Sequence, residues 1–210
     1  MKLALFCLLA AVLPAAGETR GDTAAPITLY TSFQQEPPPA VMEALQEEVD
    51  AIMAPIGLRF EWRKLAGVRG DEVSAELAVV TFQGRCDMAG LTENNKFTGA
   101  LGWTHVSDGE ILPFTDIACD RVGEFVRRAL VTVSPAERLG TYGRALGRVL
   151  AHELYHIFAN TVRHGSSGVA KECYTVQELL GQDFQFQARE SRLLRLSRVH
   201  PPAGQVLATH

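Results

Sequence analysis

One segment decides the fold: residues 134–159, with the sequence SPAERLGTYGRALGRVLAHELYHIFA. It opens with a capping serine, Ser134, followed by Pro135 at the first helical position and Glu137 three residues after the cap. These features are typical of a helix start. The segment is therefore predicted to form a helix that runs to about residue 159. Three glycines weaken its first half, so the sequence also allows a break near Thr141.

Successive residues of a helix are turned by about 100°, which sorts the side chains of this segment into two arcs. The apolar arc consists of Leu146, Leu150, Leu154 and Ile157, and the opposite arc of Arg144, Arg148 and Tyr155. We expect the first arc to face the core and the second to face solvent. His152, Glu153 and His156 fall between the arcs on one flank, a position suited to the floor of a cleft.

This flank carries the motif HExxH, formed by His152, Glu153 and His156. Two imidazoles one helical turn apart project side by side and can bind a single Zn²⁺, while the adjacent glutamate reaches a water on that ion. The spacing predicts His152 and His156 as metal ligands, one catalytic zinc ion as the cofactor, and Glu153 as the catalytic residue.

At these residues the chain resembles the zincin metallopeptidases. The resemblance implies a third protein ligand, which metzincins take from the continuation HExxHxxGxxH. Ala159 and Val162 stand at those two positions here, and the next histidine is His164. A straight helix would carry His164 about 12 Å beyond His156. His164 reaches the metal only if the chain reverses, and Asn160, which tolerates left-handed geometry, favours such a reversal.

We predict His164 as the third ligand, with a glutamate from a following helix, Glu178 or Glu172, as the alternative that other zincins suggest. Metzincins also carry a methionine turn near the metal. The methionines here lie only at positions 1, 42, 53 and 88, and residues 165–170 stand where that turn is expected. The chain is thus similar to a divergent metzincin without a Met-turn. Tyr174 is a candidate for stabilising an oxyanion, or else a buried structural residue.

The resemblance implies a secreted zinc metalloendopeptidase that hydrolyses peptide bonds through a zinc-activated water, with Glu153 as general base. Its partner would be a peptide or protein substrate. The alternative is a non-catalytic, zinc-binding or pseudo-peptidase interaction module, which a fourth protein ligand such as Glu172 or Cys173 would favour.

In the rest of the chain, alternating and continuous apolar runs predict strands, and apolar residues at helical spacing predict further helices. The predicted strands are 27–33, 58–63, 77–82, 101–106 and 111–118, and the other predicted helices are 40–54, 120–130, 176–180 and 188–196. The nearly continuous apolar character of 77–82 places it in the centre of a sheet. The fold class is α+β, zincin-like, with a twisted mixed sheet packed on helices and an edge strand for an extended peptide.

The two ends of the sequence indicate which residues are removed from the chain and in which compartment the product is expected. Residues 1–17 resemble a signal peptide, with Lys2 before eleven apolar residues and small residues at the cleavage site. We expect a single domain over residues 18–200, a disordered tail at 201–210, and a secreted or periplasmic product without a membrane anchor. The formal net charge of −4 gives no basic field, so nucleic acid is not an expected partner.

Three cysteines remain after that cleavage, and an oxidising compartment favours a disulfide. Three pairings are possible. We favour Cys86 with Cys119, because both flank extended segments. Cys173 would then be a free thiol, expected to be buried, or a neighbour of the metal site.

Overall fold

The computed structural model describes residues 26–70, 72–88 and 99–199. Its elements are β1 (Ile27–Gln35), α1 (Pro39–Met53), η1 (Ala54–Ile56), β2 (Phe60–Lys64), η2 (Leu65–Gly67), β3 (Leu77–Arg85), β4 (Gly102–Ser107), β5 (Glu110–Ala118), α2 (Cys119–Leu130), α3 (Pro135–Phe158), η3 (Gly168–Ala170), α4 (Val176–Leu180) and α5 (Ala188–Val199). The expected class, a mixed sheet packed on helices that include the HExxH helix, is confirmed. The predicted signal peptide and the predicted disordered tail lie outside the described residues.

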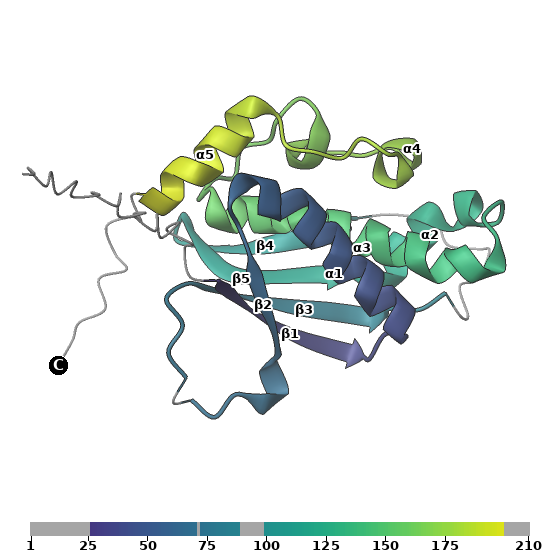
Figure 1. The fold of residues 1–210 in the computed structure, drawn as a ribbon, viewed down its shortest axis with the longest axis horizontal. Coiled ribbons are helices and arrows are strands. Elements are labelled where there is room, and N and C mark those ends of the chain that lie inside the picture. Colours follow the sequence, from purple (N-terminus) through teal and green to yellow (C-terminus); the bar gives the residue numbers. More distant parts are fainter. Residues whose placement is uncertain (1–25, 71, 89–98, 200–210) are drawn as a thin grey trace, which may run out of the picture.

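A five-stranded sheet in the order β2-β1-β3-β5-β4 forms one layer of the fold (Figure 1). Four strands run parallel, and β4 pairs antiparallel with β5 at one edge. β3 lies in the centre, as its apolar run predicted. The turn between β4 and β5 holds Asp108 and Gly109, both with positive φ, which suits the tight hairpin.

One hydrophobic cluster joins the sheet to the helices. It includes Leu29 of β1, Phe82 of β3, Leu45 of α1 and Leu146 of α3, all fully buried. Alternate residues of β3 enter this cluster, because successive side chains of a strand point to opposite faces. The packing fixes α3, and with it the HExxH motif, against the sheet.

The break near Thr141 that the sequence allowed does not occur. α3 is continuous from Pro135 to Phe158, and two of its glycines lie where α1 crosses it. A Cβ at Gly143 would stand 2.4 Å from the carbonyl oxygen of Val41, and one at Gly147 would stand 2.8 Å from that of Leu45. The glycines therefore permit a close contact between α1 and α3, whose packing outweighs their low helix propensity.

The side of α3 that carries Arg144, Arg148 and Tyr155 was expected to face solvent, but most of it is covered. The expectation that Arg148 and Tyr155 face solvent is therefore wrong. Both are buried, and only Arg144 of that arc is exposed. Arg148 donates to Glu48 over 2.6 Å and to the carbonyl of Leu179 over 2.9 Å, and the ring of Tyr155 packs on Phe186. The chain after residue 168 covers this side of α3, an arrangement that helical periodicity cannot foresee.

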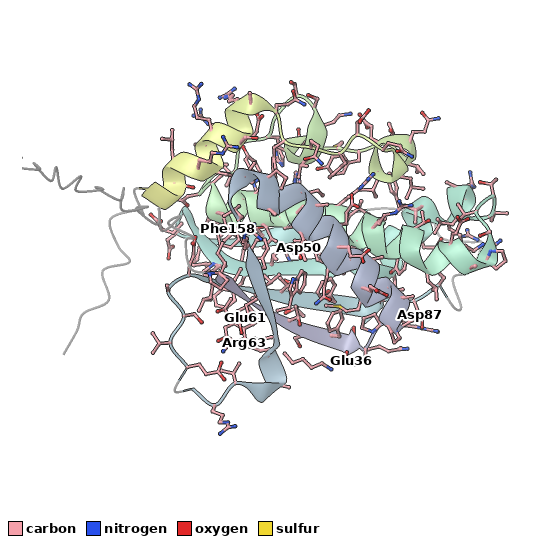
Figure 2. The ribbon with its side chains drawn as sticks, in the orientation of Figure 1. Glu36, Asp50, Glu61, Arg63, Asp87 and Phe158 are labelled. Atoms are coloured by element: carbon pink, nitrogen blue, oxygen red, sulfur yellow. A yellow bond between two sulfur atoms is a disulfide. The ribbon has the colours of Figure 1, made fainter. Side chains whose placement is uncertain are left out.

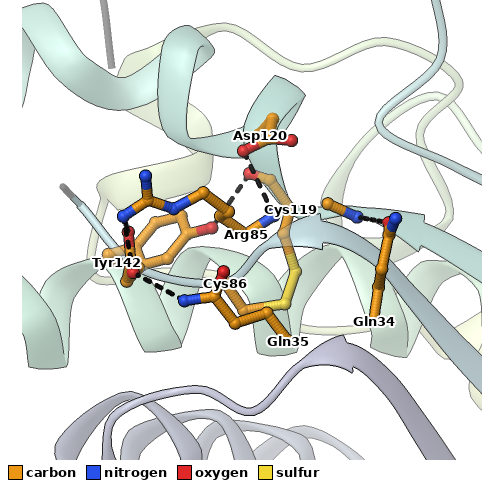
Figure 3. Close-up of a disulfide and its surroundings, with 9 residues drawn as sticks. Gln34, Gln35, Arg85, Cys86, Cys119, Asp120 and Tyr142 are labelled. Carbon is orange, nitrogen blue, oxygen red and sulfur yellow. Dashed lines mark hydrogen bonds and ion pairs between the residues drawn. A yellow bond between two sulfur atoms is a disulfide. The ribbon is translucent and has the colours of Figure 1, made fainter. Parts of the chain in front are cut away.

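A disulfide joins Cys86 after β3 to Cys119 at the start of α2, the pairing that the sequence favoured (Figure 3). The buried Tyr142 of α3 donates a hydrogen bond to the carbonyl of Cys119 over 2.9 Å. Cys173 is free but exposed, so the expectation of burial is wrong.

The other sheet edge, β2, is charged. Glu61 and Arg63 form an ion pair of 2.9 Å on this strand (Figure 2), and Arg63 also contacts Glu72. Charged side chains of this kind oppose the pairing of an edge strand with another chain. None of the helices in the described ranges has the length and apolar character needed to cross a membrane.

Candidate metal centre

The C-terminal half of α3 places His152, Glu153 and His156 on the flank that borders the sheet edge. α3 ends at Phe158, and two residues later Asn160 has a left-handed φ of 45°. The backbone nitrogen of Thr161 then donates to the carbonyl of His156 over 3.2 Å, which ties the departing loop to the helix. The expected reversal of the chain at Asn160 is confirmed.

The reversal carries His164 back over the helical pair. The ring of His164 stacks on that of His152 with centroids 5.3 Å apart, and lies edge-on to that of His156 at 4.8 Å. One potential ligand atom from each of the three histidines lies within 4.8 Å of the others. The structure thus brings together the three side chains that the sequence named as metal ligands.

Hydrogen bonds on the far side of both helical imidazoles decide which nitrogen faces the metal position. Nδ1 of His152 lies 2.8 Å from the carbonyl oxygen of Val169, and Nδ1 of His156 lies 2.7 Å from that of Thr161. A carbonyl only accepts, so each Nδ1 carries the proton and each neutral ring presents an unprotonated Nε2. The two segments after α3 therefore orient both rings.

These two Nε2 atoms lie 3.1 Å apart. Two lone pairs at this separation repel one another, whereas a cation between them is bound by both. A tetrahedral zinc ion with Zn–N bonds of about 2.05 Å holds its nitrogens about 3.3 Å apart. The donor set and its spacing therefore fit zinc.

Burial keeps both helical histidines neutral. It lowers the pKa of His152 to about 4, and it also lowers the pKa of His156, in each case because a charged ring loses its hydration. Neutral imidazole is the form that binds metal, so the pair is competent to bind zinc at neutral pH.

Glu153 lies beside this pair and is held from β4. The hydroxyl of Thr104 donates to Oε2 of Glu153 over 2.8 Å and contacts its main-chain carbonyl at 3.2 Å. Burial raises the pKa of Glu153 to about 7, and the bonds from Thr104 oppose that rise. A carboxyl with a pKa near 7 is matched to proton transfer at neutral pH.

A cavity of about 430 Å³ opens over the three histidines and Glu153. β4, the last strand of the sheet, forms one wall, and residues 172–174 contribute to another. The apolar residues of the lining include Leu101, Trp103, Ile111, Phe125 and Val149. The metal position therefore faces a space that can admit a ligand, as catalytic zinc sites require.

The glutamates considered as third ligands lie outside the cluster. Glu178 forms the capping box of α4 with Thr175 and binds Nζ of Lys171 at 2.6 Å. Glu172 and Cys173 line the cavity. Among the residues that the structure describes, the cluster of potential ligands consists of the three histidines.

Tyr174 lines the cavity and contacts the His152 ring from its Nδ1 side. Its hydroxyl lies 2.9 Å from Nδ1 of His152 and donates to the carbonyl of Val169. It is therefore behind the ring, away from Nε2, where it supports the orientation of His152. Val169 belongs to the segment that stands in place of the Met-turn.

Sequence reasoning missed the residues that hold the motif in place. Thr104 has no signal of its own in the predicted strand 101–106, and Val169 and Thr161 act through main-chain carbonyls, which any residue type supplies. His105 binds Asp116 away from the cluster.

A scan against protein-family models finds no match, and no curated protein matches the sequence. Among solved structures, the chain is similar to archaemetzincin from Methanopyrus kandleri, with a TM-score of 0.49 and 14% sequence identity. The similarity covers 86% of this chain and 99% of the archaemetzincin chain.

Proposed function

We propose that this chain is a zincin-type metallopeptidase that hydrolyses peptide bonds with one zinc ion held by His152, His156 and His164. One observation carries the proposal. The potential ligand atoms of the three histidines lie within 4.8 Å of one another, and the same side chains line a cavity together with Glu153. An open face of this kind distinguishes a catalytic zinc site from a structural one.

A zinc ion bound there supplies Lewis-acid chemistry, which lowers the pKa of a bound water to about 7 and polarises a carbonyl. The proton is handled by Glu153. Its Oε2 accepts from the hydroxyl of Thr104, and the main chain of Thr104 also donates to the carboxylate. The carboxylate of Glu153 takes the proton of the attacking water and delivers it to the leaving amine.

The neighbouring strand supports a peptide as the substrate. β4 pairs with β5 on one side and is the last strand of the sheet, and residues 102–104 line the cavity. An extended peptide can add to such an edge through main-chain hydrogen bonds, which bind any sequence and leave its side chains to the pockets.

Metal analysis and peptide hydrolysis together test the proposal. We expect about one equivalent of zinc in the wild type and in Glu153→Gln, and a loss of zinc in His164→Ala. His105→Ala, a histidine outside the cluster, is the matched control and should keep the metal. Glu153→Gln should reduce turnover by about a hundredfold or more, while Glu47→Gln, the same change on the exposed side of α1, should not.

Two results would contradict this assignment. A wild-type chain with less than half an equivalent of zinc, unaffected by His164→Ala, would remove the metal centre. Full zinc content without hydrolysis across a broad peptide library would favour the non-catalytic, zinc-binding module instead.

We further propose that the chain is exported, with residues 1–17 removed as a signal peptide. The Cys86–Cys119 disulfide supports this proposal, because structural disulfides persist in oxidising compartments. Expression of the full chain in a secreting host should yield an exported product whose N-terminus, read by mass spectrometry, lies near residue 18. A product that retains residues 1–17 would argue for an uncleaved N-terminal anchor.

A further inference from the structure

A second hollow begins at His164. It has a volume of about 360 Å³ and lies between the end of α3, the loop that follows it, and α5. His164 lines both this hollow and the metal cavity. The two hollows thus adjoin at His164.

Three arginines line this hollow: Arg163, Arg189 and Arg192. All three are exposed, and their guanidinium groups form no ion pair or hydrogen bond with the residues described. Arg148 and Arg63, by contrast, form ion pairs with Glu48 and Glu61. We call the hollow that these three residues line the arginine groove.

One acidic residue, Glu190, also lines the arginine groove. Its side chain belongs to the buried face of α5 and is only 7% exposed, and its Oε2 is inaccessible to solvent. A ligand at the surface thus meets the three guanidinium groups. Even with Glu190 ionised, three positive charges and one negative leave the groove at +2, on a chain whose formal net charge is −4.

We infer that the arginine groove binds acidic side chains of the peptide substrate, on one side of the bond held at the metal centre. The inference rests on the proposed peptidase function and names its substrate class. Guanidinium groups bind carboxylates through paired, charge-assisted hydrogen bonds. Arg163 is the direct neighbour of His164, and an extended peptide advances about 3.3 Å per residue. The acidic residue therefore lies within a few positions of the scissile bond.

Equilibrium binding tests this inference without relying on hydrolysis. Fluorescent peptides of one length, all amidated at the C-terminus, carry glutamate, glutamine or lysine on one side of a central apolar residue. Their binding is followed by anisotropy in the zinc-loaded Glu153→Gln chain, where peptides are not consumed. We expect the glutamate peptide to bind about two- to fivefold more tightly than the glutamine peptide. That preference should weaken at 0.5 M salt.

Arg189→Gln with Arg192→Gln is the test variant. We expect it to remove most of the preference for glutamate and to leave binding of the glutamine peptide unchanged. The control is Arg69→Gln with Arg128→Gln, which removes the same charge from exposed positions outside the groove and should preserve the preference. In the active wild type, kcat/KM should follow the same order of peptides.

Each failure has its own signature. Equal binding of glutamate and glutamine peptides would contradict the inference that the arginine groove binds acidic side chains. An equal loss of the preference for glutamate in the test and control variants would contradict it as well. A preference confined to peptides with a free C-terminal carboxylate would overturn it in favour of a site for chain ends. Preferred binding of glutamate peptides without any hydrolysis by the wild type would defeat the peptidase assignment and leave the groove standing.

Discussion

The hydroxyl of Thr104, on the edge strand β4, donates a 2.8 Å hydrogen bond to the carboxylate of Glu153 on α3. The same hydroxyl contacts the main-chain carbonyl of Glu153. A strand side chain thus fixes the rotamer of the proposed general base from the opposite wall of the cavity. The bond holds Oε2 of the carboxylate beside the histidine pair.

Thr104→Val keeps the shape of the side chain and removes this donor. We expect kcat for peptide hydrolysis to fall by about tenfold, the value of a hydrogen bond to a charged group, with KM and zinc content unchanged. Thr104→Ser restores the hydroxyl and should restore most of kcat. If the serine variant is as slow as the valine variant, or if valine has the wild-type rate, Thr104 does not position Glu153.

Gly143→Ala should destabilise the protein, although alanine is the better helix former. The added Cβ would lie 2.4 Å from the carbonyl oxygen of Val41 in α1, and such overpacking costs about 1–3 kcal/mol. The urea dependence of unfolding measures the change in free energy. Gly140→Ala is the matched control. Its Cβ would meet nothing within 4 Å, so it should gain about 0.5–1 kcal/mol. Equal effects at both positions would contradict the close contact of α1 with α3.

Glu178 should contribute to stability in a pH-dependent way. Its hydrogen bonds to Lys171, and then to Thr175, lower its pKa from 4.5 to about 2. A lowered pKa in the folded state stabilises the fold above the unfolded value of 4.5, and this contribution disappears as the pH falls towards 2. Thermal unfolding of Glu178→Gln should therefore show a smaller loss of stability between pH 4.5 and 2 than the wild type.

The same variant separates a helix-capping role for Glu178 from metal binding. We expect Glu178→Gln to keep its zinc, because the carboxylate lies in the capping box of α4 and outside the histidine cluster. Glu43→Gln, on the exposed side of α1, is the control and should lose stability between pH 4.5 and 2 as the wild type does. Loss of zinc in Glu178→Gln, or a pH dependence parallel to that of the wild type, would show that the carboxylate acts elsewhere.

The sequence predicted the elements because their signals are local. Every predicted strand and helix occurs, with boundaries displaced by no more than three residues. α3 starts at Pro135, as predicted, although the Ser134 hydroxyl donates to the Glu137 carboxylate and makes no cap bond to the backbone. The left-handed Asn160 sets the reversal that brings His164 to the pair. The candidate site could therefore be named in advance, since two ligands share a helix and the third follows a short loop.

What the sequence did not predict depends on contacts between distant segments. Arg148 and Tyr155 are buried because residues after 168 fold over α3. Gly143 and Gly147 of α3 are explained by α1, about one hundred positions earlier. The carbonyls of Val169 and Thr161 hold the imidazoles through main-chain atoms, so their residue types carry no signal. A threonine in a strand likewise gives no indication in the sequence that its hydroxyl binds a glutamate.

Both helical imidazoles are locked by carbonyl oxygens and packed between the sheet and the C-terminal segments. The ligand side chains therefore lose their conformational entropy when the chain folds, and not when an ion binds. Such a centre is preorganised, so loading and folding are separable events, in contrast to zinc fingers, which unfold without metal. A chelator should therefore yield a folded apoprotein that regains its ion on simple addition of zinc.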